Sequence, residues 1–190
     1  MRKLALSTMM AATLASAIFA QEIKDRKENQ QDRIANGVES GQLTAGETAN
    51  LEHKEAGLNK EIRNDREANG GNLTNNEKAQ INRQQNRLSN QIHNDKHNAA
   101  TAHYGNNEVG ARRENQQDRI AQGMKSGQLT AGESAKLEGQ ESRINREVRN
   151  DRAANGGNLT NNQKARINRQ QNRESARIYN KKYNAAKGPK

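Results

Sequence analysis

The chain has 190 residues, of which 32 are Lys or Arg and 22 are Asp or Glu, and its formal net charge is +10. It contains no Cys, no Trp, one Phe and one Pro. Without Cys it has no disulfide, thiolate metal site, cysteine nucleophile or cysteine-linked lipid anchor. With three Tyr and one Phe it also has little aromatic surface for stacking on bases or sugars.

Residues 1–20 have the pattern of a secretory signal peptide. Two basic residues precede an uncharged apolar run over residues 4–19, and cleavage can follow Ala20 or, as a second candidate, Ala17. The run is shorter than the ~20 residues that a transmembrane helix needs. We therefore expect a cationic mature chain that is periplasmic or secreted and contains no membrane span.

The rest of the chain contains one segment written twice. Residues 28–100, the first copy, align without gaps to residues 114–186, the second copy, at an offset of 86 residues with 52 of 73 positions identical. Such a duplication predicts a repeat protein. The sequence divides into a signal peptide (1–20), a first three-helix repeat unit (21–100), a linker (101–113), a second three-helix repeat unit (114–186) and a tail (187–190).

A shorter motif, Gly-x-Leu-Thr followed by two residues and then Glu or Gln, occurs four times and marks helix starts. It spans residues 41–47, 71–77, 127–133 and 157–163. In this capping box the Thr side chain accepts a hydrogen bond from the backbone three residues later, and the Glu or Gln reaches back to the Thr backbone. Gly70 and Gly156, each after Asn, supply the left-handed position that ends the preceding helix.

These signals predict six helices, at residues 22–36, 45–69, 75–98, 108–122, 131–155 and 161–184. Because apolar residues show no period-two alternation, we expect no significant β structure. Each helix carries an aliphatic pair eleven residues apart, which is three turns, so both members lie on one face.

If the chain reverses at each turn, the aliphatic pairs fall into two layers per copy. In the first copy one layer is Ile23, Ile62 and Ile81, and the other is Ile34, Leu51 and Ile92. The matching residues of the second copy are Val109, Val148 and Ile167, and Ile120, Leu137 and Ile178.

The sequence thus predicts an all-α fold of two tandem three-helix antiparallel units, in which helical hairpins resembling a coiled coil are joined by capping-box turns. Glu174 replaces Leu88, so we expect the last helix to pack less well. Few large aliphatic residues are available, and we expect docking between the units, or self-association, to stabilise them.

The four turns resemble the second half of an EF-hand calcium loop, in which a Gly is followed by an aliphatic residue and a closing Glu. The resemblance places Glu47, Glu77 and Glu133 at the closing position. The first half of the loop does not match, since two turns offer Arg66 and Arg152 where Ca²⁺ needs oxygen ligands. The capping turn is the favoured interpretation, and an EF-hand-like divalent-cation-binding protein is an alternative hypothesis.

Other candidate chemistry is sparse. His93 and His97 have a spacing that can bind zinc, but the second copy carries Tyr179 and Tyr183 there, so we interpret all four as surface or interface residues. No Ser-His-Asp arrangement is repeated in both copies, and no phosphate-binding glycine loop occurs. We expect no enzymatic activity and no cofactor.

Charged residues are interspersed along the predicted helices, which is typical of solvated helix faces. Two pairs of arginines four residues apart, Arg83 with Arg87 and Arg169 with Arg173, are candidate interaction residues. They support a second alternative hypothesis, an electrostatic binder of polyanions.

The mature chain resembles exported bacterial proteins built from Asn/Gln-rich repeats of the GQLTAGE type, a motif that stands here at residues 41–47 and 127–133. The resemblance implies no activity. We expect an exported, non-enzymatic helical repeat protein that acts as a structural or interaction module of the cell envelope or extracellular space. Its partner would be a protein or envelope component still to be identified, or a second copy of the chain.

Overall fold

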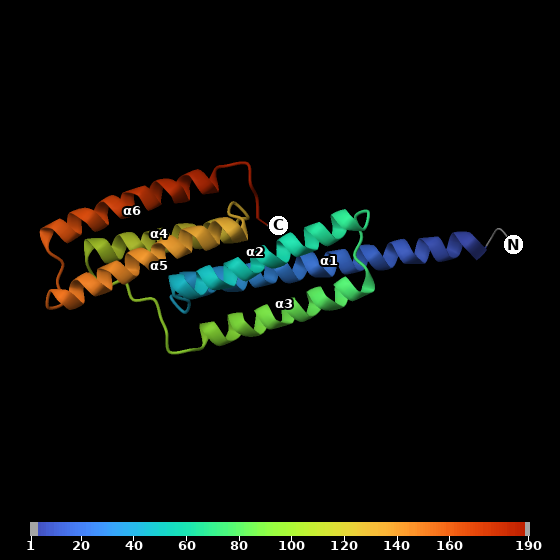
Figure 1. Ribbon diagram of the computed structural model, residues 1–190, viewed down its shortest axis with the longest axis horizontal. Coiled ribbons are helices and arrows are strands. Elements are labelled where there is room, and N and C mark those ends of the chain that lie inside the picture. The colour runs from blue at the N-terminus through green and yellow to red at the C-terminus, as the bar shows by residue number, and fades with distance from the viewer. Residues whose placement is uncertain (1–3, 189–190) are drawn as a thin grey trace.

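The computed structural model describes the backbone of residues 4–188 and the side chains of residues 21–188. This part of the chain is all-helical, with six α-helices and no strand. The helices are α1 (Leu4–Glu39), α2 (Ala45–Ala68), α3 (Asn75–Lys96), α4 (Glu108–Lys125), α5 (Ala131–Ala154) and α6 (Asn161–Lys182). They lie lengthwise, with α1, α2 and α3 toward one end of the molecule and α4, α5 and α6 toward the other (Figure 1).

Helices α2 to α6 begin at the residues that the sequence predicts and end within three residues of the predicted ends. For α2, α3, α5 and α6 the reason is local, because all four predicted capping boxes are formed. In each, the Thr side chain accepts from the backbone N–H three residues later, and the Glu or Gln there accepts from the Thr backbone N–H; the four are Thr44, Thr74, Thr130 and Thr160. Gly70 and Gly156 follow the ends of α2 and α5 with left-handed φ angles of 62° and 61°.

Helix α1 differs from the prediction, which placed it at residues 22–36. It begins at Leu4 and ends at Glu39. No Gly or Pro occurs between residues 4 and 36, and the Ala-, Leu- and Met-rich segment before residue 20 favours helix, so nothing interrupts the backbone. The signal-peptide prediction concerns residues 1–20, whose side chains lie outside the described part, and it stays a prediction. Among the described residues, no helix is long and apolar enough to span a membrane.

Helix α4 begins inside the segment 101–113 that the sequence assigns to the linker. The side chain of Asn107 accepts a hydrogen bond from the backbone N–H of Gly110 at 3.1 Å and caps the helix. The connection between α3 and α4 is therefore only residues 97–107.

The predicted aliphatic layers are found in the core. One buried cluster contains Ile23, Leu58, Ile62, Leu73 and Ile81. A second contains the matching residues Val109, Ile144, Val148, Leu159 and Ile167. The remaining layer of each copy joins its counterpart in one shared cluster, which includes Ile34, Leu51, Ile92, Ile120, Leu137 and Ile178. The two copies thus share the central part of their core.

The most extensive helix packing joins the two copies, with α2 against α5 and, next, α1 against α4. A methyl group at Gly46 would lie 3.3 Å from Ser142 Oγ, and one at Gly132 would lie 3.8 Å from Ala56 Cβ. Both pairs of residue numbers have the same sum, so α2 and α5 cross antiparallel. Small residues on both helices let the backbones approach closely, and this crossing buries the shared layer.

Candidate functional site

The interior of the molecule contains a polar layer of Gln and Glu side chains. The buried members are Gln30, Gln31, Glu52, Glu55 and Gln85 in the first copy, and Gln116, Gln117, Glu138, Glu141, Gln171 and Glu174 in the second. The interpretation of the charged residues as a solvated face is wrong for these glutamates. A sequence signal for them exists, since Gln85 follows Ile81 by four residues and Glu55 follows Leu51 by four, which puts them on the aliphatic faces.

Glutamine amides in this layer tie the helices together. The side chain of Gln30 donates to the backbone carbonyl of Gln85 at 2.7 Å, and that of Gln85 donates to the carbonyl of Ile23 at 3.3 Å. Gln31 donates to Glu52 Oε1 at 2.7 Å. The same three bonds recur 86 residues later, from Gln116 to Gln171, from Gln171 to Val109 and from Gln117 to Glu138. Buried amides therefore link α1 to α2 and α3, and α4 to α5 and α6.

Burial shifts the titration of the carboxyl groups in the polar layer. It raises the pKa of Glu55 to about 7 and the pKa of both Glu138 and Glu141 to about 8. The pKa of Glu52 is raised well above its ordinary value, first by burial and then by Glu55. Glu55, Glu138 and Glu141 therefore keep their protons up to near neutral pH.

Glu174, which stands in place of Leu88, is also buried. Burial raises the pKa of its carboxyl group, and the Arg177 guanidinium, 3.2 Å away, lowers it. Helix α6 thus keeps a polar group where α3 has a leucine in the shared core.

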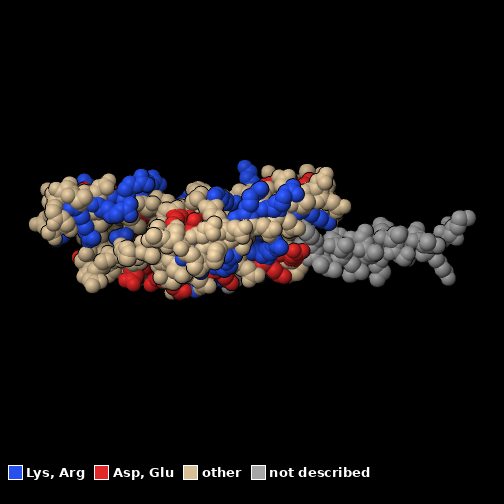
Figure 2. Space-filling view, turned by 90° about the horizontal axis from the view of Figure 1, so that it is seen from below, with Lys and Arg blue, Asp and Glu red and all other residues tan. Residues whose placement is uncertain are grey.

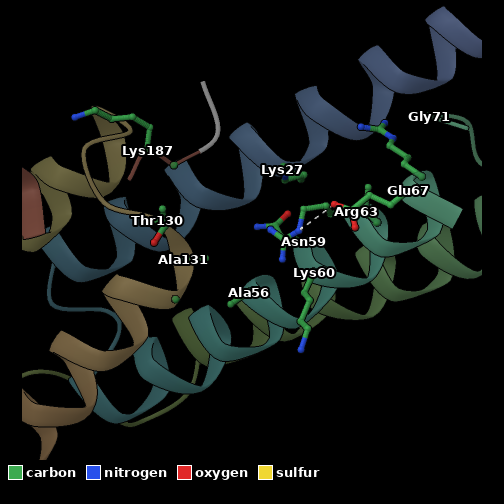
Figure 3. A pocket seen from close by; sticks show the side chains of 14 residues that line it. Lys27, Ala56, Asn59, Lys60, Arg63, Glu67, Gly71, Thr130, Ala131 and Lys187 are labelled. Carbon is green, nitrogen blue, oxygen red and sulfur yellow. Dashed lines mark ion pairs between the residues drawn. The ribbon is translucent and has the colours of Figure 1, made fainter. Parts of the chain in front are cut away.

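A groove of about 830 Å³ opens between α1, α2 and the start of α5 (Figure 3). Figure 3 shows Lys27 on the α1 side, Asn59 and Arg63 on α2, and Thr130 at the start of α5. Five cationic side chains line the groove, namely Lys27, Lys60, Arg63, Arg66 and Lys187, against one carboxylate, Glu67. Its apolar lining comes from Ala56, Ile62 and Ala131. The groove therefore combines positive charge with a small apolar wall.

The charge of the groove is only weakly compensated. Glu67 lies 4.0 Å from Arg63, and both side chains are exposed, so this ion pair is weak. Burial lowers the pKa of Lys27; the nearby Glu55 raises it and Arg66 lowers it. The N-terminus of α5, at Thr130, adds the positive end of a helix dipole. Figure 2 shows Lys and Arg gathered mainly along one long edge of the molecule in that view, and Asp and Glu mainly along the other.

The glutamates that the EF-hand resemblance singled out have capping roles in the structure. Glu47 and Glu133 each accept from their own Thr backbone N–H, at 2.9 and 3.1 Å, and from an Asn side chain at 2.6 Å. Glu77 accepts from the Thr74 N–H at 2.7 Å. The three lie at different turns and are not brought together. Within the described residues, no group of three or more His, Cys, Asp or Glu side chains is arranged to hold a metal ion.

The two histidines and their tyrosine counterparts are exposed pairs on α3 and α6. The His93 and His97 ring centroids are 4.3 Å apart, and those of Tyr179 and Tyr183 are 4.7 Å apart. His97 Nδ1 lies 2.7 Å from the backbone carbonyl oxygen of His93, so this ring nitrogen has a local partner.

The four candidate arginines are exposed on two helices that lie on opposite sides of the molecule (Figure 1). Arg83 and Arg87 belong to α3, whereas Arg169 and Arg173 belong to α6. Within the described residues, none of the four guanidinium groups makes a hydrogen bond or an ion pair. The structure does not bring the two pairs together, and it places neither pair in the basic groove.

Sequence reasoning missed the groove, because its walls come from segments far apart in the chain. Its one local signal is the three-residue spacing of Lys60, Arg63 and Arg66 along α2. Comparison of the chain with family models, with curated proteins and with solved structures finds no significant match.

Proposed function

We propose that this chain is an exported, non-enzymatic interaction module built from two tandem three-helix repeats, and that it binds an anionic ligand or partner in the basic groove. The observation that carries the proposal is the groove itself, where five cations and one carboxylate line about 830 Å³. Such a concentration of one charge sign beside low-dielectric walls attracts anions.

Three further observations support the parts of this proposal. The tandem-repeat reading is supported by the amide bonds of the polar layer, which recur at the 86-residue offset of the duplication. The non-enzymatic reading is supported by the position of the perturbed glutamates, which are buried in the polar layer rather than exposed in a cleft. Two of them, Glu52 and Glu138, accept hydrogen bonds from glutamine side chains. Export is supported by the signal-peptide pattern of residues 1–20.

The binding proposal is tested with citrate, a small anion without an aromatic ring. Titration of the full chain, followed by backbone amide NMR shifts, should show saturable shifts around Lys27, Arg63, Arg66 and the start of α5. Added salt should weaken the binding, since the attraction is electrostatic.

The duplication supplies a matched control for this experiment. Replacing Arg63 and Arg66 by Ser should abolish the shifts, while the same change at their counterparts Arg149 and Arg152 should leave them. Shifts spread evenly over α3 and α6 would instead assign binding to the arginines of those helices and contradict the groove.

A further inference from the structure

The groove has a counterpart in the second copy, and there the position is filled by an aromatic ring. Tyr104, from the connection between α3 and α4, is partly buried. The Arg113 guanidinium lies 5.2 Å from the centre of the Tyr104 ring, which is cation–π geometry. Burial raises the pKa of the Tyr104 hydroxyl, and Glu138 raises it further, so the ring lies at the edge of the polar layer.

The correspondence between the two places follows from the offset of 86 residues. Arg113 corresponds to Lys27, which lines the groove, and Arg152 corresponds to Arg66, which also lines it. A methyl group at Gly105 would lie 3.9 Å from Arg152 Nη1, so the Tyr104 segment passes beside that arginine. The groove is therefore the first copy's version of the Tyr104 site, and no described aromatic side chain lines it.

The chain segments that lead to the groove and to the Tyr104 site also correspond. The backbone N–H of Ala102 donates to the carbonyl of Gly41 at 2.9 Å, and the N–H of Gly188 donates to the carbonyl of Gly127 at 2.9 Å. The two donors are 86 residues apart, as are the two acceptors. The sequence places Lys190, outside the described residues, 86 positions after Tyr104. A lysine supplies no aromatic ring.

One difference restricts what can fill the groove. At Gly110 of α4, a methyl group would lie 2.1 Å from the Gly105 carbonyl oxygen and 2.2 Å from that of Tyr104, so glycine is needed for the chain to cross there. The counterpart of Gly110 is Lys24 on α1. A chain cannot take the same path past Lys24, so a ring in the groove must belong to a molecule that approaches by another route.

The residues that line the groove determine the charge of the molecule that can occupy it. The Tyr104 ring lies beneath Arg113, and the groove keeps basic residues at the matching places, since Arg146 and Arg149 of the second copy correspond to Lys60 and Arg63. The groove adds Lys187, whose counterpart is the uncharged Thr101. Ala56 and Ile62 give the ring an apolar contact.

We propose, building on the proposed function, that the groove binds an aromatic ring that carries a carboxylate. The ring takes the place that the Tyr104 ring holds in the second copy, under the Lys27 ammonium, and the carboxylate faces Arg63 and Arg66. Two sources share this chemistry, a free aryl carboxylate and the tyrosine at the carboxyl end of a peptide chain.

The experiment compares 4-hydroxyphenylacetate with acetate and 4-methylphenol by calorimetric titration of the full chain. We expect the aryl carboxylate to bind about tenfold more tightly than either fragment, because it alone engages both the cation–π contact and the arginines. Lys27→Met should remove this preference, and Lys27→Arg, which restores the residue of the Tyr104 site, should preserve it. Circular dichroism of both variants checks that the helices are intact.

Gly-Gly-Tyr with a free carboxyl end, and its amide, form the second arm. Binding of the free-acid tripeptide as tightly as 4-hydroxyphenylacetate supports the proposal with a chain end as the source, and weaker binding supports it with a free aryl acid. If 4-hydroxyphenylacetate binds no better than acetate while citrate still binds in the groove, the ring proposal is overturned and the proposed function survives. If citrate does not bind either, both fail.

Discussion

The two copies share most of their residues but differ at one buried position and at one surface site. In α3, the Leu88 side chain packs into the shared core. Its counterpart in α6 is Glu174, which buries a carboxyl group. The first copy has a groove between α1, α2 and the start of α5, and no described aromatic side chain lines it, whereas at the corresponding place in the second copy the Tyr104 ring lies beneath Arg113. Both copies nevertheless have the same arrangement of helices. Helix caps and aliphatic layers therefore tolerate substitutions that change a buried side chain or the shape of a surface site.

The largest expected effect concerns the pH dependence of stability. The pKa of Glu55, Glu138 and Glu141 is raised to about 7, about 8 and about 8 in the folded chain. The folded state therefore binds more protons than the unfolded state above pH ~4.5, and the free energy of unfolding should fall as pH rises toward about 8. Urea denaturation at pH 5 and pH 9 measures this, and greater stability at pH 9 would contradict it.

The glutamates of the two copies should contribute unequally to this fall in the free energy of unfolding with pH. The charge of Glu174 raises the pKa of Glu141 further, although Arg113 and Arg119 lower it. Among the charged neighbours of Glu55, only Lys27 acts strongly, and it lowers the pKa. Glu141→Gln should therefore flatten the pH profile more than Glu55→Gln, and the reverse order would show that the electrostatic difference between the copies is unimportant.

Exchanging the residues at the Leu88 position should have the next largest effect. Leu88→Glu should cost about 3–5 kcal/mol, because it buries a carboxyl group where the counterpart of Arg177 is the uncharged Gln91. Glu174→Leu should be neutral or stabilising by about 1 kcal/mol at pH 8, since it removes a buried titratable group. Chemical denaturation of both variants checks the pair, and equal costs in the two directions would contradict the comparison.

The smallest effect concerns the caps of α3 and α6. Thr74→Ala removes the side chain that accepts from the Glu77 N–H and should cost about 1 kcal/mol. Thr160→Ala should cost a similar amount, because the Gln163 box has the same hydrogen bonds. Thermal melts followed by circular dichroism measure both, and an unchanged midpoint for either variant would mean that its box does not support the helix.

Much of the fold could be predicted, but little of the candidate site. The starts of α2, α3, α5 and α6 were predicted because a capping box is made by residues only three apart. The layer of Ile23, Ile62 and Ile81 was predicted because helical spacing and chain reversal fix the level of each side chain. The polar layer was missed, although Gln85 and Glu55 stand at apolar-face spacing, because polar side chains were assumed to face solvent.

The sequence by itself determined the helices, their caps and the level of each aliphatic layer, since these depend on interactions within one or two turns and on short reversals. Only the tertiary structure decided that α2 crosses α5, that both copies share one core cluster, and that Tyr104 fills one site while a groove lies at its counterpart. These outcomes depend on contacts between the two copies, such as that of Glu39 with Lys125, and on the space that Gly46 and Gly132 leave where α2 meets α5. The Tyr104 site also depends on Gly110, past which the chain crosses closely. Local propensity carries no information on which distant surfaces meet, so the packed arrangement alone decides them.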